Sequence, residues 1–63
     1  MIELTRLNDT KFILNAELIE SIEEVPDTVI ALTTWKKLFV KENKYEIRDL
    51  VVRYKQEVFN KIL

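Results

Sequence analysis

Apolar and polar side chains alternate at the start of the chain. Ile2 and Leu4 fall on one face of an extended segment and their polar neighbours on the other, which predicts a half-buried strand over residues 1–7. Asn8-Asp9 has turn chemistry, because both side chains bond their own backbone and tolerate left-handed conformations. Residues 10–14 are therefore expected to return as the second strand of a hairpin.

The next segment carries weaker signals. Asn15 can cap one short helical turn over residues 15–18. Residues 18–25 fit either a helix or a strand, and Pro26-Asp27 must end whichever forms. We favour a strand, because the β-branched segment 28–33 begins directly after that turn.

A second hairpin is expected around Thr34-Trp35. The turn at these residues joins segment 28–33 to an alternating strand over residues 36–41. Leu38 and Val40 share one face of this strand, and Phe39 is left on the other face.

The last third predicts a helix. Asn43 is a good N-cap, and Glu46 follows three positions later, as in a capping box. One apolar stripe has helical spacing and is suited to cover a sheet: Ile47, Leu50, Val51, Tyr54, Val58 and Ile62. The pattern as a whole predicts an α+β fold, with a small antiparallel sheet of about five strands and one C-terminal amphipathic helix packed on it. We expect one domain over residues 1–63, β-rich in 1–42 and helical in 43–63.

The helix carries a second apolar line, formed by Tyr45, Val52, Phe59 and Leu63. At about 100° per residue it lies roughly 130° around the axis from the first stripe. One sheet does not easily cover both, so this line is expected to pack on another copy of the chain or on a partner. The alternative is that Tyr45 and Leu63 only decorate fraying ends.

Large aromatic side chains are also in excess on the predicted sheet. Phe12, Trp35 and Phe39 lie near hairpin ends or off the Leu38/Val40 face, which indicates an interface. Alternatively, Phe12 belongs to the core and only Trp35 is exposed. The candidate partner or oligomer interface therefore comprises Trp35, Phe39, Tyr45, Val52, Phe59 and Leu63.

The amino-acid composition excludes several kinds of catalytic and ligand-binding site. The 63 residues include no histidine, cysteine or glycine, which removes the commonest general base, thiolates and glycine-rich phosphate loops. We expect no enzymatic activity, no cofactor and no small-molecule substrate. A small chain without disulfides or a metal often gains stability by association, so we expect a homo-oligomer.

Charge is divided unevenly along the chain. Residues 1–27 hold seven acidic and two basic side chains, whereas residues 28–63 hold eight basic and four acidic ones. The near-neutral total makes nucleic acid an improbable partner. The acidic run from Glu17 to Asp27 lacks the loop pattern of a calcium site, so we expect a solvated edge and no metal.

No membrane-spanning or export segment is expected. The longest apolar run, residues 29–32, is far shorter than a spanning helix, and the first residues lack a basic, apolar signal sequence. We therefore expect a cytoplasmic protein that does not insert into a membrane.

An ordered set of residues resembles a known family. It comprises Met1-Ile2-Glu3-Leu4-Thr5-Arg6-Leu7-Asn8, Leu14-Asn15, Leu18-Ile19-Glu20, Ile22-Glu23, Pro26-Asp27-Thr28-Val29-Ile30, Leu32-Thr33, Lys36-Lys37 and Val40-Lys41-Glu42. The set is similar to the flagellar FlbD/SwrD proteins over residues 1–42, and the helix that follows is similar in kind.

The resemblance implies a non-enzymatic accessory factor for swarming motility that binds a flagellar stator or motor protein at the inner face of the membrane. Relatives tend to carry Asn-Gly where this chain has Asn8-Asp9 and Thr34-Trp35. Because tight two-residue turns favour glycine, we expect one hairpin to use a longer loop. Trp35 is expected to add a contact that relatives lack.

Two other functions stay open. The opening residues 2–6 and the order of five strands and a helix are similar to CsrA, a dimeric RNA-binding regulator. RNA would need a basic strip, and the acidic segment opposes it. The other possibility is a scaffold with no partner beyond itself.

Overall fold

The computed structural model describes residues 1–62, and the side chains of residues 1–61. Five strands, one short 3₁₀ turn and one helix follow in the expected order. They are β1 (Ile2–Thr5), β2 (Lys11–Leu14), η1 (Ala16–Leu18), β3 (Ile19–Glu24), β4 (Thr28–Leu32), β5 (Lys37–Val40) and α1 (Lys44–Ile62). The predicted α+β class is confirmed, and residues 19–24 form the strand that was favoured over a helix.

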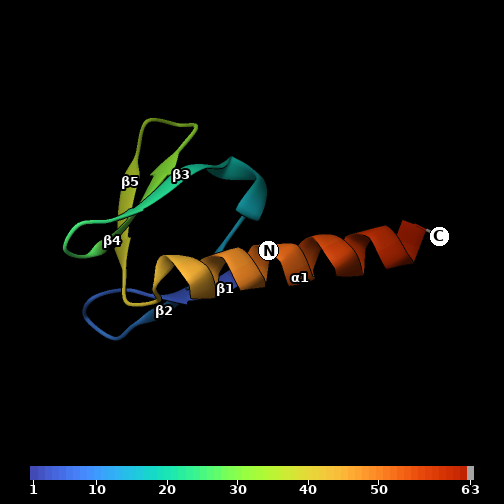
Figure 1. Ribbon diagram of the computed structural model, residues 1–63, viewed down its shortest axis with the longest axis horizontal. Helices are drawn as coiled ribbons and strands as arrows, with labels where there is room; N and C mark the ends of the chain where they lie inside the picture. Colours follow the sequence, from blue (N-terminus) through green and yellow to red (C-terminus); the bar gives the residue numbers. More distant parts are fainter. Residues whose placement is uncertain (63) are drawn as a thin grey trace.

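The strands form two antiparallel sheets, not one, with orders β1-β2 and β3-β4-β5 (Figure 1). The break lies at η1, where the Asn15 side chain accepts a hydrogen bond from the Glu17 N–H (3.1 Å) and the chain turns away from β2. The sheets meet at one corner, where Arg6 bridges to Val40.

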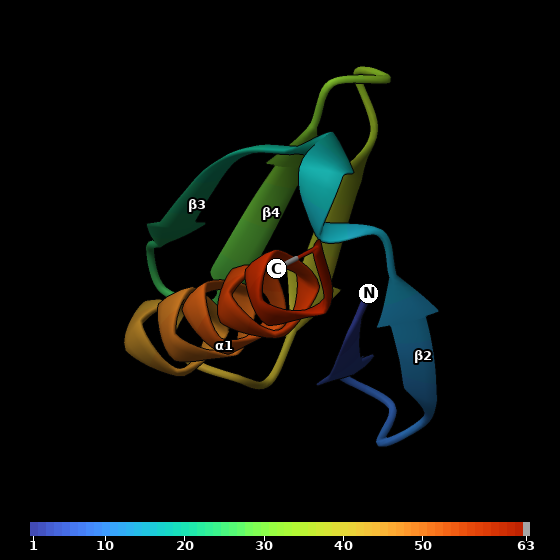
Figure 2. The same ribbon diagram turned by 90° about the vertical axis from the view of Figure 1, so that its right-hand side faces the viewer.

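The core lies where the two sheets and the helix meet. In Figure 2 the helix runs beside the β1–β2 hairpin and across the three-stranded sheet. The buried apolar side chains come from all of these elements: Ile2, Leu4, Leu14, Ala16, Ile30, Leu32, Val40 and Ile47. Ile47 is fully buried, and it is the helix residue on which both sheets close. Phe12 is partly buried against this core. Of the two alternatives for Phe12, an interface residue or a core residue, the structure therefore favours the core residue.

The helix begins as predicted. The Glu46 N–H donates to the Asn43 side-chain oxygen (2.8 Å), which is N-capping geometry. Glu46 returns the interaction by accepting from the Asn43 side-chain amide (2.8 Å), in place of the backbone N–H of a standard capping box. Glu24 on β3 also accepts from the Lys44 N–H (3.0 Å), so side chains satisfy two of the free N–H groups of the first turn.

The apolar stripe of the helix covers the sheets only along its first half. Leu50, Val51 and Tyr54 are partly buried against the core. Val58, which the pattern assigned to the same stripe, is 39% exposed. The helix has 19 residues and is therefore about 28 Å long, whereas the sheets end near Tyr54. Figure 1 shows its last turns projecting beyond the strands. The side chain of Ile62 lies outside the described residues.

Candidate protein interaction surfaces

The β1–β2 and β4–β5 hairpins, at the two predicted turns, each close with a three-residue loop. In the first, the Asp9 N–H donates to the Arg6 carbonyl (2.9 Å) and the Arg6 N–H donates to the Thr10 carbonyl (2.8 Å). Asp9 lies in the left-handed region, with φ 73°. This is a β-turn followed by a left-handed residue, the commonest three-residue hairpin loop. The turn predicted at Asn8-Asp9 is confirmed, but with the longer loop.

The second hairpin repeats this pattern with tryptophan in the left-handed position. The Trp35 N–H donates to the Leu32 carbonyl (3.0 Å), and the Leu32 N–H donates to the Lys36 carbonyl (2.8 Å). Trp35 has φ 71°. Positive φ is unusual for a bulky residue, because the Cβ atom crowds the backbone, and glycine is favoured there. Both hairpins, not one, therefore use the longer loop.

The Trp35 side chain is 95% exposed, the most exposed large apolar side chain in the described chain. The strained backbone is thus not offset by burial of the indole ring. Lys36 and Lys37 follow it directly and are exposed as well. The tip of the β4–β5 hairpin therefore presents an aromatic ring beside two lysines, and Glu20 lines the same depression.

Phe39 lies on the uncovered face of the three-stranded sheet. Leu38 and Val40 point toward the core, as the alternation predicted, and Phe39 is 50% exposed on the other face. Its cross-strand partner is Val29 on β4, and Lys37 is paired with Ala31. Cross-strand neighbours share a face of the sheet, so the exposed Phe39 and the partly buried Val29 form one apolar pair on this face.

Trp35 and Phe39 belong to one continuous surface. A shallow depression beside Trp35 is lined by Ala31 and Lys37, among others. A second depression beside Phe39 is also lined by Lys37, and by Leu7 from the first hairpin loop. We call the surface formed by Leu7, Trp35, Lys37 and Phe39 the hairpin surface.

Leu7 was missed by the sequence analysis, which placed it at the end of a strand. It lies in the loop and is 46% exposed. An apolar residue next to a turn pair is the only signal that could have indicated it. The Arg6 guanidinium stacks over the Phe12 ring, 4.2 Å from the centroid, and both residues line the same depression as Leu7.

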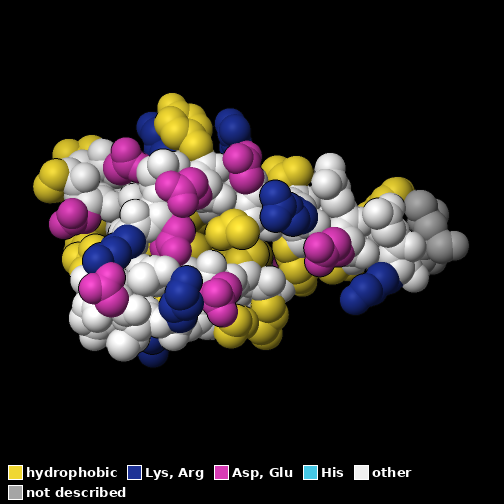
Figure 3. Space-filling view, turned by 90° about the horizontal axis from the view of Figure 1, so that it is seen from below, with side chains coloured by type: hydrophobic (Ala, Val, Ile, Leu, Met, Phe, Trp, Pro, Cys, Tyr) yellow, Lys and Arg dark blue, Asp and Glu magenta, His cyan; other side chains and the backbone are white. Residues whose placement is uncertain are grey.

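The helix presents a separate apolar face. Tyr45, Val52 and Phe59 are 58%, 48% and 60% exposed. Val52 and Phe59 line an open groove along the helix together with Lys55, Gln56 and Asn60. Figure 3 shows hydrophobic side chains among charged ones on the part of the helix beyond the sheets. We call Tyr45, Val52 and Phe59 the helix face. Leu63, the fourth residue of the predicted line, lies outside the described residues.

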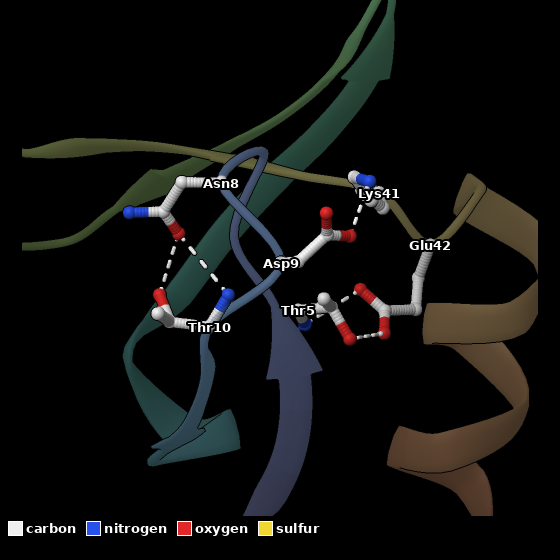
Figure 4. Close-up of polar contacts among 6 residues, drawn as sticks. All are labelled: Thr5, Asn8, Asp9, Thr10, Lys41 and Glu42. Carbon is white, nitrogen blue, oxygen red and sulfur yellow. Dashed lines mark hydrogen bonds and ion pairs between the residues drawn. The ribbon is translucent and has the colours of Figure 1, made fainter.

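Two polar links fix the corner between the sheets and the helix (Figure 4). Glu42 accepts hydrogen bonds from the Thr5 N–H (2.9 Å) and the Thr5 hydroxyl (2.8 Å). Burial alone raises the pKa of Glu42, but these bonds outweigh it and leave the pKa below its ordinary value. Lys41 forms an ion pair with Asp9 at the surface. The first hairpin is thereby tied to the start of the helix.

The acidic run is distributed along an exposed edge. Glu20 and Glu23 lie exposed on β3, which is an outer strand of its sheet. The Glu24 carboxylate already has hydrogen-bond donors: it accepts from the Lys44 N–H at the helix N-terminus and, at 3.4 Å, from the Thr28 hydroxyl. Charged outer strands resist pairing with other sheets, so this edge is unsuited to strand addition.

Comparison with known families identifies the chain. The model of the FlbD family, described as flagellar and swarming motility proteins, matches residues 1–59. The chain belongs to the FlbD family. The match extends through most of the helix, further than the resemblance over residues 1–42 had reached, so this FlbD-family protein shares the helix with its family as well as the strands. Searches of curated proteins and of solved structures gave no match.

The structure brings the predicted contact residues together in two groups. Trp35 and Phe39 lie on the hairpin surface, and Tyr45, Val52 and Phe59 lie on the helix face. Within the described residues, no helix is both long enough and apolar enough to cross a membrane.

Proposed function

We propose that this FlbD-family protein is a non-enzymatic accessory factor of flagellar and swarming motility. It acts by binding a protein of the flagellar motor or stator, in the cytoplasm at the inner face of the membrane. The family supplies the link to motility. The exposure of Trp35 carries the proposal that the activity is binding.

The hairpin surface has the character of a binding hot spot. Tryptophan and arginine dominate such sites, because a large rigid ring buries much area at small entropic cost. Trp35 is 95% exposed, so a partner pocket could cover nearly the whole indole ring. Burying about 200 Å² of aromatic surface contributes about 5 kcal/mol before the costs of association.

The rim of this surface indicates the chemistry of the partner. Lys36 and Lys37 are exposed beside Trp35, and no ion pair involves either of them within the described chain. A partner that accepts the ring in an apolar pocket with carboxylates at its edge would match both features. Binding should then weaken as salt rises, since exposed charges are screened.

Swarming of a deletion strain complemented with variants tests the proposal. Trp35→Ala and Phe39→Ala should each abolish or strongly reduce swarming, with unchanged protein level and circular dichroism. Val25→Ala is the matched control, because Val25 is 82% exposed and lies outside the hairpin surface. Full swarming by both hairpin variants would contradict the proposed site.

A further inference from the structure

The helix face has the spacing of a helix-pairing seam. Tyr45, Val52 and Phe59 recur every seven residues and stay within about 20° of one line along the helix. They are about half exposed, while the opposite side of the same helix holds Ile47 in the core. Such a repeat supplies one of the two apolar positions per heptad by which helices pair, and the positions three and four residues from Val52 are polar: Arg48, Asp49, Lys55 and Gln56. The occupant of the helix face is therefore expected to be a helix.

Charges beside this seam differ between its two flanks. Taking about 100° per residue, Arg48 and Lys55 lie roughly 40° and 60° to one side of Val52. Asp49 and Gln56 lie roughly 60° and 40° to the other side. All four side chains are exposed. Within one chain, Arg48 forms an ion pair with Asp49 (3.3 Å), and its guanidinium lies 5.5 Å from the centroid of the Tyr45 ring. One flank is therefore basic, and the other is acidic or neutral.

These flanks discriminate between the two ways in which identical helices can pair. In an antiparallel pair each flank faces itself, so Arg48 would oppose Lys55 of the second copy. In a parallel pair the two flanks face each other, so Arg48 and Asp49, which already pair within one chain, would also lie opposite Asp49 and Arg48 of the second copy. Like charges oppose the first arrangement, and opposite charges favour the second.

We propose that a second copy of this chain occupies the helix face, as a parallel dimer with Val52 at the centre of the seam. Tyr45 then meets Tyr45 of the second copy, and Phe59 meets Phe59. The last turns of the helix project beyond the strands, which leaves room for a neighbouring helix (Figure 1). The dimer uses a different surface from the hairpin surface, so either proposal can fail alone.

The dimer should be weak and reversible. The half-exposed aromatic side chains of Tyr45 and Phe59 contribute about 100 Å² each and Val52 contributes less, so the seam buries on the order of 200–300 Å² per copy. A standard stable interface buries about 800 Å² per partner. The charged flanks add area but not enough to reach that size. We therefore expect dissociation in the micromolar range and a concentration-dependent equilibrium.

Sedimentation equilibrium of the full chain between about 10 and about 500 µM tests association. We expect the average mass to rise toward twice 7.6 kDa. Val52→Glu should stay monomeric with an unchanged circular dichroism spectrum. Val25→Glu makes the same change of charge at an exposed apolar residue away from the helix and should still dimerise. A wild-type chain that stays monomeric throughout would overturn the proposal.

Single cysteines test the orientation, and they do so even if Val52→Glu is unfolded. The sequence contains no cysteine, so each introduced thiol reports one position. In the parallel dimer, Tyr45→Cys alone and Phe59→Cys alone should each form a disulfide-linked dimer under mild oxidation. In an antiparallel dimer the same positions lie about 21 Å apart, and only the mixed pair of the two variants would cross-link. Cross-linking of the mixed pair alone, or of no combination, would contradict the proposal.

Discussion

Replacing Trp35 by glycine should make the protein more stable and at the same time inactive. The backbone at this residue is left-handed, with φ 71°, and its side chain is 95% exposed. Glycine adopts this conformation without steric cost, so the substitution relieves the backbone while it removes the indole ring. A residue that only shaped the turn would not separate stability from activity in this way.

The expected change in the free energy of unfolding for Trp35→Gly is the sum of three effects. A left-handed conformation costs a residue with a Cβ atom about 1–2 kcal/mol, which glycine avoids. The greater freedom of glycine in the unfolded chain costs roughly 0.5–1 kcal/mol. Loss of burial is negligible, because Trp35 is almost entirely exposed. The net gain is about 0.5–1 kcal/mol, which raises the Tm of a domain of this size by several degrees, on the order of 2–8 °C.

Thermal unfolding and swarming should be measured on the same variants. Asp9→Gly is the matched control, because Asp9 has φ 73° in the equivalent loop position but lies outside the hairpin surface. It loses an exposed ion pair with Lys41, worth only a few tenths of a kcal/mol. Asp9→Gly should leave the Tm unchanged or slightly lower, because aspartate tolerates the left-handed region while glycine is freer in the unfolded chain, and it should keep swarming intact. A Tm for Trp35→Gly at or below that of the wild type would refute the reasoning on backbone strain, and intact swarming would refute the role of the ring.

Three further results are expected. Because the pKa of Glu42 is lower in the folded than in the unfolded chain, its carboxylate stabilises the fold above the ordinary glutamate pKa, and this contribution is lost as the pH falls through the folded value. Glu42→Gln should therefore lower the free energy of unfolding by about 1–2 kcal/mol near neutral pH and make that free energy less dependent on pH in the acid range. An unchanged pH dependence would contradict the stabilising role of the Thr5 link. Ile47→Ala should lower the free energy of unfolding by about 2–5 kcal/mol, because this helix side chain is fully buried in the core. That loss is enough to unfold much of the population at 37 °C, which circular dichroism would detect. RNA gel shifts at low salt should give no complex, and a salt-sensitive complex would instead support the CsrA-like alternative.

Local patterns were sufficient to predict the elements of this fold. The alternation at Ile2 and Leu4 and the capping pair Asn43 and Glu46 depend on neighbours a few residues apart, so periodicity and turn chemistry predict them. The same holds for Asn15 and the short turn that follows it. These interactions form within one turn or one strand, and the folded structure keeps them.

Features that depend on distant residues could not be predicted. The Thr5 and Glu42 link joins residues 37 positions apart, and the bridge from Arg6 to Val40 forms the corner where the two sheets meet. The exposure of Val58 depends on where the sheets end, which the helix pattern does not contain. Sequence spacing therefore indicated the right elements, but it overestimated how far the sheets cover the helix.

The sequence indicated most, but not all, of the residues in the two contact groups. Trp35 and Phe39 were identified as surplus aromatic side chains, and both are exposed in the structure. Leu7 was missed, because its position depends on the three-residue loop that pairs Arg6 with Thr10. Whether these side chains contact a partner stays a prediction.

The central claim is that the exposed ring on the hairpin surface contacts a protein of the flagellar motor. Incorporation of a photo-reactive phenylalanine analogue at position 35 in living cells, followed by irradiation and mass spectrometry of the cross-linked product, tests it most directly. The account predicts a cross-link from position 35 to a stator or motor protein and none from the same analogue at position 25, since Val25 is exposed but distant from the hairpin surface. Equal labelling from both positions, or a product containing only this chain, would contradict it.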